Sequence, residues 1–337
     1  MTNRRTVLDA IAHRETDRVP HNVELTSDEL TKVCASVGIG KGEFFAWAGN
    51  MVEKVPCNSG GEAVSPGLFR DEFGVIWDRG GADKDIGVVT EYPMGEASDG
   101  GYAFPEPRVG AIKAAMAECL DGGRDTVRLA KISFSYFERA WSLRGMERLL
   151  IDFLSDPREA RRILDGILAF NLALIDEALR HDVDGFYIGD DYGQQKGLIM
   201  GPDIWREFLR PGLREMFSKI KSKGKVIAFH SCGDNREILG DFVDIGLDVY
   251  QTVQPEIYDL PSLKRDFGAD LSFWGCISTQ RLMPFASPAE MKDEVRRVIG
   301  IMAKGGGFIV SPTHQVPADV PPENVVAFVE VMRDRDY

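Results

Sequence analysis

Short runs of apolar and β-branched residues alternate along this chain with longer stretches in which apolar residues recur at helical spacing. The short runs have the length and composition of buried strands. Repeated strand-then-helix units indicate parallel strands joined by crossover helices. The runs that we predict as strands are Thr126–Ile132, Gly185–Ile188, Lys225–Phe229, Asp248–Val253, Leu271–Gly275 and Gly307–Val310.

Start signals mark the helical stretches between these runs. Ser155–Ile175 is predicted as a helix with Ser155 as its cap and a proline in its first turn. Pro202–Lys221 carries apolar residues near a period of 3.6. Ser287–Met302 opens with Ser-Pro-Ala-Glu, the pattern of a capping box.

Two further runs, Arg18–Leu25 and Gly74–Trp77, bring the number of possible strands near eight. This number favours a closed eight-stranded α/β barrel of the TIM type over an open sheet. A length of 337 residues also suits one such domain spanning residues 1–337, since barrels of this type typically exceed about 250 residues. We expect an N-terminal extension, and insertions within residues 26–125, where glycines are frequent and periodicity is ambiguous. Residues 34–125 are expected to shape the substrate pocket.

The chain has 53 acidic and 40 basic residues and a net charge of −13, which argues against broad binding to nucleic acid or to anionic membranes. Met1–Arg18 lacks the apolar run of a signal peptide, and no later segment reaches about 18 uninterrupted apolar residues. We therefore expect a cytoplasmic protein. The five cysteines are scattered and odd in number, unlike a disulfide framework.

Polar side chains with acid–base or metal-binding chemistry follow five consecutive predicted strands. In a parallel barrel these positions meet at the carboxyl-terminal rim, where active sites lie. Loops begin at strand ends, so aspartate and glutamine are ordinary there, but the chain has only five histidines and five cysteines. The positions are Asp190, Asp191, Tyr192 and Gln194, then His230, Ser231 and Cys232, then Gln254, then Cys276, and finally Thr313, His314 and Gln315.

His230 and Cys232 form the sharpest local pattern. Residues i and i+2 of an extended segment face the same side, so the imidazole and the sulfur can converge on one cation. Zinc suits this mixed nitrogen–sulfur set, and three protein ligands would leave one position open for catalysis. The third ligand is His314 or Cys276. The alternative is a buried histidine beside a buried cysteine, as free cysteines often are.

Asp190 and Asp191 form a carboxylate pair at a strand end. Two neighbouring carboxylates raise the pKa of one of them, which suits an acid or base. A loop or helix-capping role is an equal alternative for either residue. Further side chains predicted to line a substrate pocket are His21, Trp77, Tyr192, Gln194 and Gln254.

The chain resembles the uroporphyrinogen decarboxylase superfamily over nearly its whole length. The family fold is a (β/α)8 barrel, in agreement with the number of strands. The stretches that carry the resemblance are Asp17–Pro20, Asp71–Gly74, Leu143–Glu147, Asp190–Gly193, Phe229–Gly233, Pro312–His314 and Pro321–Asn324.

One branch of this superfamily is the tetrapyrrole decarboxylase, which needs no metal and uses an arginine-rich N-terminal R-Q-A-G-R-Y segment to hold carboxylates. The corresponding segment here, Asp17–Thr26, lacks those arginines. Arg18 alone does not replace the bidentate clamps that such a substrate needs. A decarboxylase acting on a porphyrinogen or a smaller acid is therefore the second hypothesis, and a non-catalytic barrel that binds a tetrapyrrole-like ligand is the third.

The other branch comprises zinc methyltransferases whose signature is H-x-C followed by a distant cysteine. His230 and Cys232 match, and His314 occupies the position of the distant cysteine, so the resemblance implies a His-Cys-His site, with Cys276 as the alternative third ligand. Zinc would hold a thiol as thiolate or polarise a methoxy oxygen, while Asp190 or Asp191 manages the proton.

The leading hypothesis is thus a zinc-dependent methyltransferase or demethylase. The methyl donor would be a small O-, N- or S-methyl compound or a methyl-corrinoid, and the acceptor a corrinoid protein, tetrahydrofolate or a thiol. The D-x-H-x-x-G cobalamin signature is absent from the sequence, so a corrinoid would be carried by a separate partner protein. A monomer or a homodimer is expected.

Overall fold

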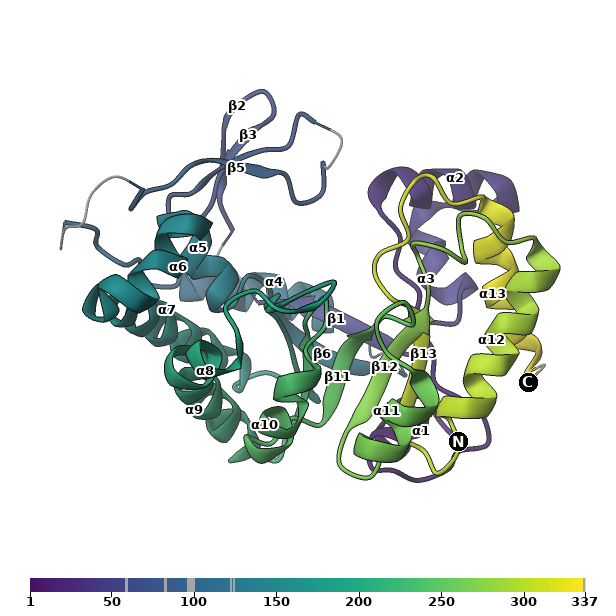
Figure 1. The fold of residues 1–337 in the computed structure, drawn as a ribbon. Helices are drawn as coiled ribbons and strands as arrows, with labels where there is room; N and C mark the ends of the chain where they lie inside the picture. Colours follow the sequence, from purple (N-terminus) through teal and green to yellow (C-terminus); the bar gives the residue numbers. More distant parts are fainter. Residues whose placement is uncertain (58–59, 82–83, 96–100, 122, 124, 336) are drawn as a thin grey trace.

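The centre of the molecule is a parallel sheet of seven strands. The computed structural model describes residues 1–337 apart from 58–59, 82–83, 96–100, 122, 124 and 336 (Figure 1). Because every neighbouring pair is parallel, all seven carboxyl ends lie at one edge. In hydrogen-bonded order the strands are β1 (Val52–Pro56), β6 (Val127–Ile132), β7 (Gly185–Gly189), β10 (Val226–His230), β11 (Val249–Val253), β12 (Ser272–Ile277) and β13 (Phe308–Pro312).

Helices occupy the stretches between the strands, which confirms the α/β class. Figure 1 shows α12 and α13 side by side near the C-terminus. Among the described residues, no helix is long and apolar enough to cross a membrane. The helices are α1 (Asn3–Ile11), α2 (Ser27–Val37), α3 (Phe44–Trp47), α4 (Val109–Leu120), α5 (Phe137–Arg144), α6 (Met146–Ser155), α7 (Pro157–Ala178), α8 (Pro202–Ile204), α9 (Arg210–Lys221), α10 (Leu239–Asp244), α11 (Leu260–Phe267), α12 (Pro288–Met302) and α13 (Pro322–Asp334), with 3₁₀ turns η1 (Lys41–Glu43) and η3 (Arg236–Ile238) and a π-helical turn η2 (Trp205–Leu209).

The capping box at the start of α12 is confirmed. The Ser287 hydroxyl accepts a hydrogen bond from the Glu290 backbone N–H, and the Glu290 carboxylate accepts one from the Ser287 N–H. The predicted cap of α7 is wrong by one residue. Ser155 still belongs to α6, and the carboxylate of Asp156 accepts from the N–H of Glu159 instead.

The segment predicted as the first strand, Arg18–Leu25, lies between β13 and the start of β1. His21 forms an isolated parallel bridge with Val310, and its carbonyl accepts a hydrogen bond from Met51 N at 3.2 Å. In the part of the chain that the structure describes, this segment makes isolated bridges and no regular strand. Closure of the sheet into an eight-stranded barrel therefore stays a prediction.

The other early strand, Gly74–Trp77, was predicted for the wrong sheet. β4 (Ile76–Asp78) belongs to a small antiparallel sheet with β2 (Glu62–Ser65), β3 (Leu68–Arg70) and β5 (Val88–Glu91). Figure 1 shows this small sheet above α5 and α6, apart from the parallel strands. Short local hairpins join these strands, so they need no crossover helix. A two-residue hairpin of β8 (Gly193–Gln194) and β9 (Gly197–Leu198) follows β7.

The inner face of the parallel sheet is filled by one layer of buried side chains, closed from the amino-terminal end by Val7 and Ile11 of α1. Successive residues of a strand face opposite sides, so the next inward position lies two residues further on. These next positions form the floor of the site described below. The layer consists of Val52, Val127, Leu129, Tyr187, Ala228, Val249, Trp274 and Ile309.

Candidate metal centre

A cavity of about 580 Å³ opens over the inner face of the sheet, at the carboxyl ends of its strands. Its floor is the second inward layer, two residues beyond the apolar layer on every strand except β12. The roof comes from the small antiparallel sheet, through Phe69, Trp77 and Arg79 among others. The floor residues are Lys54 (β1), Lys131 (β6), Gly189 (β7), His230 (β10), Gln251 (β11) and Ser311 (β13).

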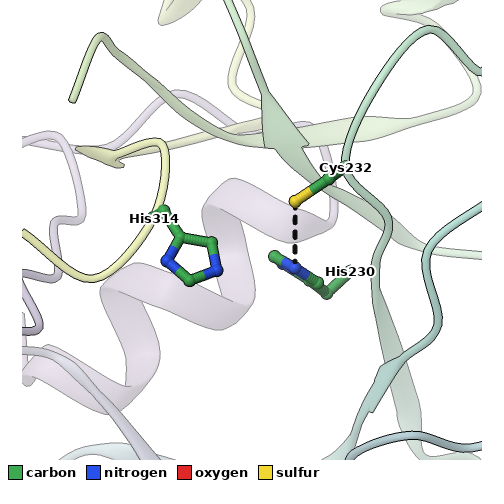
Figure 2. Close-up of side chains that lie close together, drawn as sticks. All are labelled: His230, Cys232 and His314. Atoms are coloured by element: carbon green, nitrogen blue, oxygen red, sulfur yellow. Dashed lines mark hydrogen bonds between the residues drawn. The ribbon is translucent and has the colours of Figure 1, made fainter. Parts of the chain in front are cut away.

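The structure brings His230, Cys232 and His314 together at this floor. One nitrogen or sulfur atom from each lies within 4.8 Å of the others (Figure 2). Cys232 Sγ is 3.5 Å from His230 Nε2. A tetrahedral zinc with usual bond lengths would hold a nitrogen and a sulfur about 3.6 Å apart. The separation between His230 and Cys232 therefore fits two ligands of one zinc ion, and His314 lies near enough to be a candidate third ligand.

Gln251 fixes the orientation of the His230 ring. Its amide oxygen is hydrogen-bonded to His230 Nδ1 and accepts a second bond from the Tyr187 hydroxyl at 2.9 Å. Because the amide oxygen is an acceptor, Nδ1 carries the proton. The Nε2 lone pair then points at Cys232, which is the arrangement that a metal-binding imidazole needs.

Desolvation sets the protonation of the three candidate ligands. Burial lowers the pKa of His230 and brings the pKa of His314 to about 4, so both rings are neutral at pH 7. The His314 side chain is exposed on the lining of the open cavity. Burial, with the nearby Asp191 carboxylate, raises the pKa of the Cys232 thiol. A cation at this point would supply the positive charge that a Cys232 thiolate requires.

The loop that presents Cys232 is held by hydrogen bonds from its own neighbours. Asn235 Nδ2 donates to the Cys232 carbonyl at 3.0 Å, and the Gly233 N–H donates to Gln254 Oε1 at 2.8 Å. Gln254, predicted to line the pocket, is thus placed as a buried support of the loop. The Asp191 carboxylate accepts from Cys232 N at 2.7 Å.

The two aspartates of the strand-end pair face different surroundings. Both Asp190 oxygens accept backbone N–H groups at the start of α5, from Phe137 at 2.8 Å and Glu138 at 2.7 Å. Asp190 is fully buried, and burial raises its pKa to about 7. Asp191 lines the cavity, with Oδ1 3.6 Å from His230 Nε2. Of the pair, Asp191 is the one placed to meet a ligand.

The remaining predicted pocket residues divide into two groups. Trp77 lines the cavity and donates its indole N–H to Asp71 at 2.9 Å. Tyr192 is fully buried among aromatic rings, stacked on Phe229 at 5.7 Å between centroids. Gln194 is exposed in β8. His21 is buried, with Nε2 2.9 Å from the Ala48 carbonyl. None of Tyr192, Gln194 and His21 lies on the cavity lining.

Cys276, the alternative third ligand, does not join the cluster. If the two-residue alternation of β12 continued beyond Trp274, Cys276 would lie on the cavity floor. However, φ is 131° at Gly275 and 75° at Cys276, so the alternation is interrupted there. The sulfur is packed in the hydrophobic core instead, where burial strongly raises its pKa. His314 is therefore the better placed candidate.

The prediction from polar residues at strand ends did not include several residues that line the cavity. Lys54 and Lys131 are charged residues at inward positions of buried strands, and Gln251 lies inside a predicted strand rather than after it. Strict two-residue alternation along Thr126–Ile132 and Asp248–Val253 was the signal for Lys131 and Gln251. Glu138 begins α5 and lines the cavity, and burial with the neighbouring aspartates raises its pKa well above the usual range. Glu24 also lines the cavity.

The buried His21 imidazole provides a test of acid stability. Burial lowers its pKa to about 4, whereas an unfolded chain would protonate it near 6.5. The unfolded state thus binds more protons between these values, and stability falls as the pH falls through that window. Linkage predicts a loss of about 2 kcal/mol from pH 7 to pH 5 through this residue. Denaturant unfolding of the wild type and His21→Gln at both pH values should show a smaller pH effect in the variant; equal effects would refute the prediction.

A family model described as uroporphyrinogen decarboxylase (URO-D) matches residues 101–335, well over half of the chain. A uroporphyrinogen decarboxylase of Edwardsiella ictaluri (strain 93-146) is 23% identical over 239 residues. That match covers 68% of this chain and 65% of the relative, just under two thirds of its length.

The fold is also that of a solved structure, a methyltransferase from Methanosarcina mazei, with a TM-score of 0.75 at 18% identity. The superposition covers 100% of both chains, so the small antiparallel sheet and the parallel sheet are matched together. The family model covers more than half of the chain, including β6, β7 and β10–β13, and on this ground the chain belongs to the uroporphyrinogen decarboxylase (URO-D) family.

Proposed function

We propose that this protein is a zinc-dependent methyltransferase. It would move a methyl group from a small methylated compound or a methyl-corrinoid to a corrinoid protein, a folate or a thiol. The observation that carries the proposal is the donor set of His230, Cys232 and His314, with a nitrogen–sulfur separation of 3.5 Å at the floor of the cavity. The shared fold with a methyltransferase supports it.

Each polar residue around the cluster has a role in this proposal. His230, Cys232 and His314 would hold the metal, which when bound supplies a Lewis acid and a site for a thiolate or an oxygen. Gln251 keeps the His230 ring in place through its Nδ1–H. Asp191 would hold or accept the proton at Oδ1, beside the candidate ligands, while Asp190 stabilises the start of α5. Glu138 is the neighbouring cavity carboxyl, whose pKa is raised by burial and by the charges of Asp191 and Asp190.

We also propose that the segment carrying His21 completes a (β/α)8 barrel. Its backbone is hydrogen-bonded to Val310 on one side and to Met51 on the other, which are the two partners that an eighth strand would have. The substrate would be a small molecule, and a corrinoid, if one is used, would be carried by a partner protein.

Metal analysis of the protein purified without chelator tests the proposal. A three-ligand catalytic site should retain nearly one zinc per chain, whereas less than about 0.1 equivalent would contradict the assignment. The same zinc-loaded protein is then assayed for transfer of a ¹³C-methyl group from methylcobalamin to a thiol, followed by NMR.

Decarboxylation of a porphyrinogen is the second candidate, because the matching family model and the curated relative are both described as uroporphyrinogen decarboxylase. Arg139, a basic residue on the cavity wall, is already paired with Asp71 at 2.5 Å, so it does not offer a free clamp for a carboxylate. Formation of coproporphyrinogen from uroporphyrinogen by zinc-free protein would establish this candidate instead.

A further inference from the structure

Two lysines stand on the floor of the cavity, at the second inward position of adjacent parallel strands. Lys54 comes from β1 and Lys131 from β6, in a layer with His230 and Gln251. Lysine is almost never buried without a partner. We therefore asked which groups neutralise the charges of Lys54 and Lys131.

Lys54 is balanced within the protein. Its side chain is 11% exposed, and its ammonium lies 2.9 Å from the Glu24 carboxylate. The ammonium also lies 3.9 Å above the centre of the Tyr187 ring. An ammonium has three N–H donors, and its hydrogen bond to Glu24 uses one of them. The charge of Lys54 is thus neutralised by Glu24, and its ammonium group has N–H donors that remain available to a ligand.

Lys131 is not balanced in this way. Within the described part of the chain, no carboxylate lies within 4.0 Å of its ammonium, although it lines the cavity. Of the other basic residues on the lining, Arg139 is paired with Asp71, and Arg79 belongs to the roof, stacked over Phe69 at 4.2 Å. The floor therefore has one ammonium group without a carboxylate at ion-pair distance, and the Glu24 carboxylate, which is already bonded to Lys54, acts on it only at longer range.

This charge lies beside the candidate metal centre. His230, Lys54 and Lys131 all line the same cavity, at the carboxyl ends of β10, β1 and β6. A continuous series of contacts also joins the two ends of the floor: His230 to Gln251, Gln251 to the Tyr187 hydroxyl, and the Tyr187 ring to Lys54. A ligand in the cavity would meet the metal centre and the lysines together.

We propose that Lys131, with the spare donors of Lys54, binds the single anionic group of a compact substrate, a carboxylate or an equivalent oxyanion. This inference rests on the proposed function and names the substrate class for the same site. One unpaired cation fits one negative charge, and a charge-assisted hydrogen bond in a half-enclosed cavity is stronger than a neutral one. The anion would be anchored to β6 and β1 while the methyl group faces His314 and Cys232.

Calorimetric titration of the zinc-loaded full chain tests this subsite with matched probes. Each anion is compared with its neutral amide: methoxyacetate with methoxyacetamide, benzoate with benzamide, and methanesulfonate with methanesulfonamide; inorganic phosphate is a fourth anion. We expect at least one anion to bind about tenfold more tightly than its amide. The anion that does so identifies the oxyanion.

Lys131→Met should remove that preference and leave the affinity for the amide unchanged. Lys131→Arg should keep the preference, and Lys223→Met, at an exposed turn after α9, should match the wild type. If no anion saturates the wild type, if anion and amide bind equally, or if the preference survives in Lys131→Met because the anion sits on the metal, the proposal is wrong.

Zinc content separates this proposal from the proposed function. The Lys131 variants should bind as much zinc as the wild type, because Lys131 is not among the candidate ligands. A protein that binds no zinc but keeps a Lys131-dependent preference for anions would refute the methyltransferase and retain the subsite. A protein that binds one zinc but shows no preference would refute the subsite alone.

Discussion

Cys232→Ala is expected to lower bound zinc from nearly one equivalent to below about 0.1 and to abolish methyl transfer. The sulfur is the only thiolate donor in the His-Cys-His cluster, and its Sγ is 3.5 Å from His230 Nε2. Removing it leaves two neutral imidazoles, which bind zinc far less tightly and no longer balance its charge. Metal analysis after gel filtration and the ¹³C-methyl assay measure both effects.

Two matched variants decide which residue is the third ligand. His314→Ala should lose zinc as Cys232→Ala does, because the His314 ring closes the cluster. Cys276→Ala should keep the metal content of the wild type, since its sulfur is packed in the hydrophobic core. Loss of zinc in Cys276→Ala together with retention in His314→Ala would reverse the assignment.

Gly233→Ala is expected to destabilise the fold by at least about 3 kcal/mol and to remove zinc binding, because it displaces the loop that carries Cys232. Gly233 has a φ of 81°, which alanine adopts with strain. An added Cβ would also lie 2.2 Å from the carbonyl carbon of Gly193. That backbone cannot easily retreat, since Gly193 N donates to the Cys232 carbonyl at 3.2 Å.

Gly240→Ala is the control for this variant. Gly240 lies in α10, and a Cβ there would meet nothing within 4 Å. Alanine should be neutral or stabilise the helix by up to about 1 kcal/mol. Denaturant unfolding and zinc content measure both variants. A Gly233→Ala protein as stable as Gly240→Ala would show that the contact between the two loops is not needed.

The strands that carry the candidate metal ligands could be predicted from the sequence because their signals are local. Each is a short apolar run, and parallel pairing brings all their carboxyl ends to one edge. His230 and Cys232 converge by simple two-residue alternation. The position of Cys276 could not be predicted from the sequence, because it depends on positive φ angles at Gly275 and Cys276 that the residue pattern does not indicate.

The floor and roof of the cavity were harder to predict for a different reason. The sequence of β1 is Val-Glu-Lys-Val-Pro, and its two charged residues interrupt the apolar pattern by which the other strands were predicted. Lys54 is tolerated there only because Glu24, thirty positions away, lies 2.9 Å from it. The capping role of Asp190 likewise depends on α5, which is distant in sequence. Such pairings are set by the tertiary structure and leave no local signal.

The small antiparallel sheet has a consequence for how this enzyme family can diversify. The parallel strands supply the candidate metal ligands, whereas β3 and β4 supply roof residues such as Phe69 and Trp77 through local hairpins. The candidate metal ligands and the roof of the cavity thus come from separate segments of the chain, while Lys54 and Lys131, proposed above to bind an anionic group, belong to the parallel sheet. We expect exchange of the hairpins between relatives to alter the shape of the roof while His230, Cys232 and His314 keep their places.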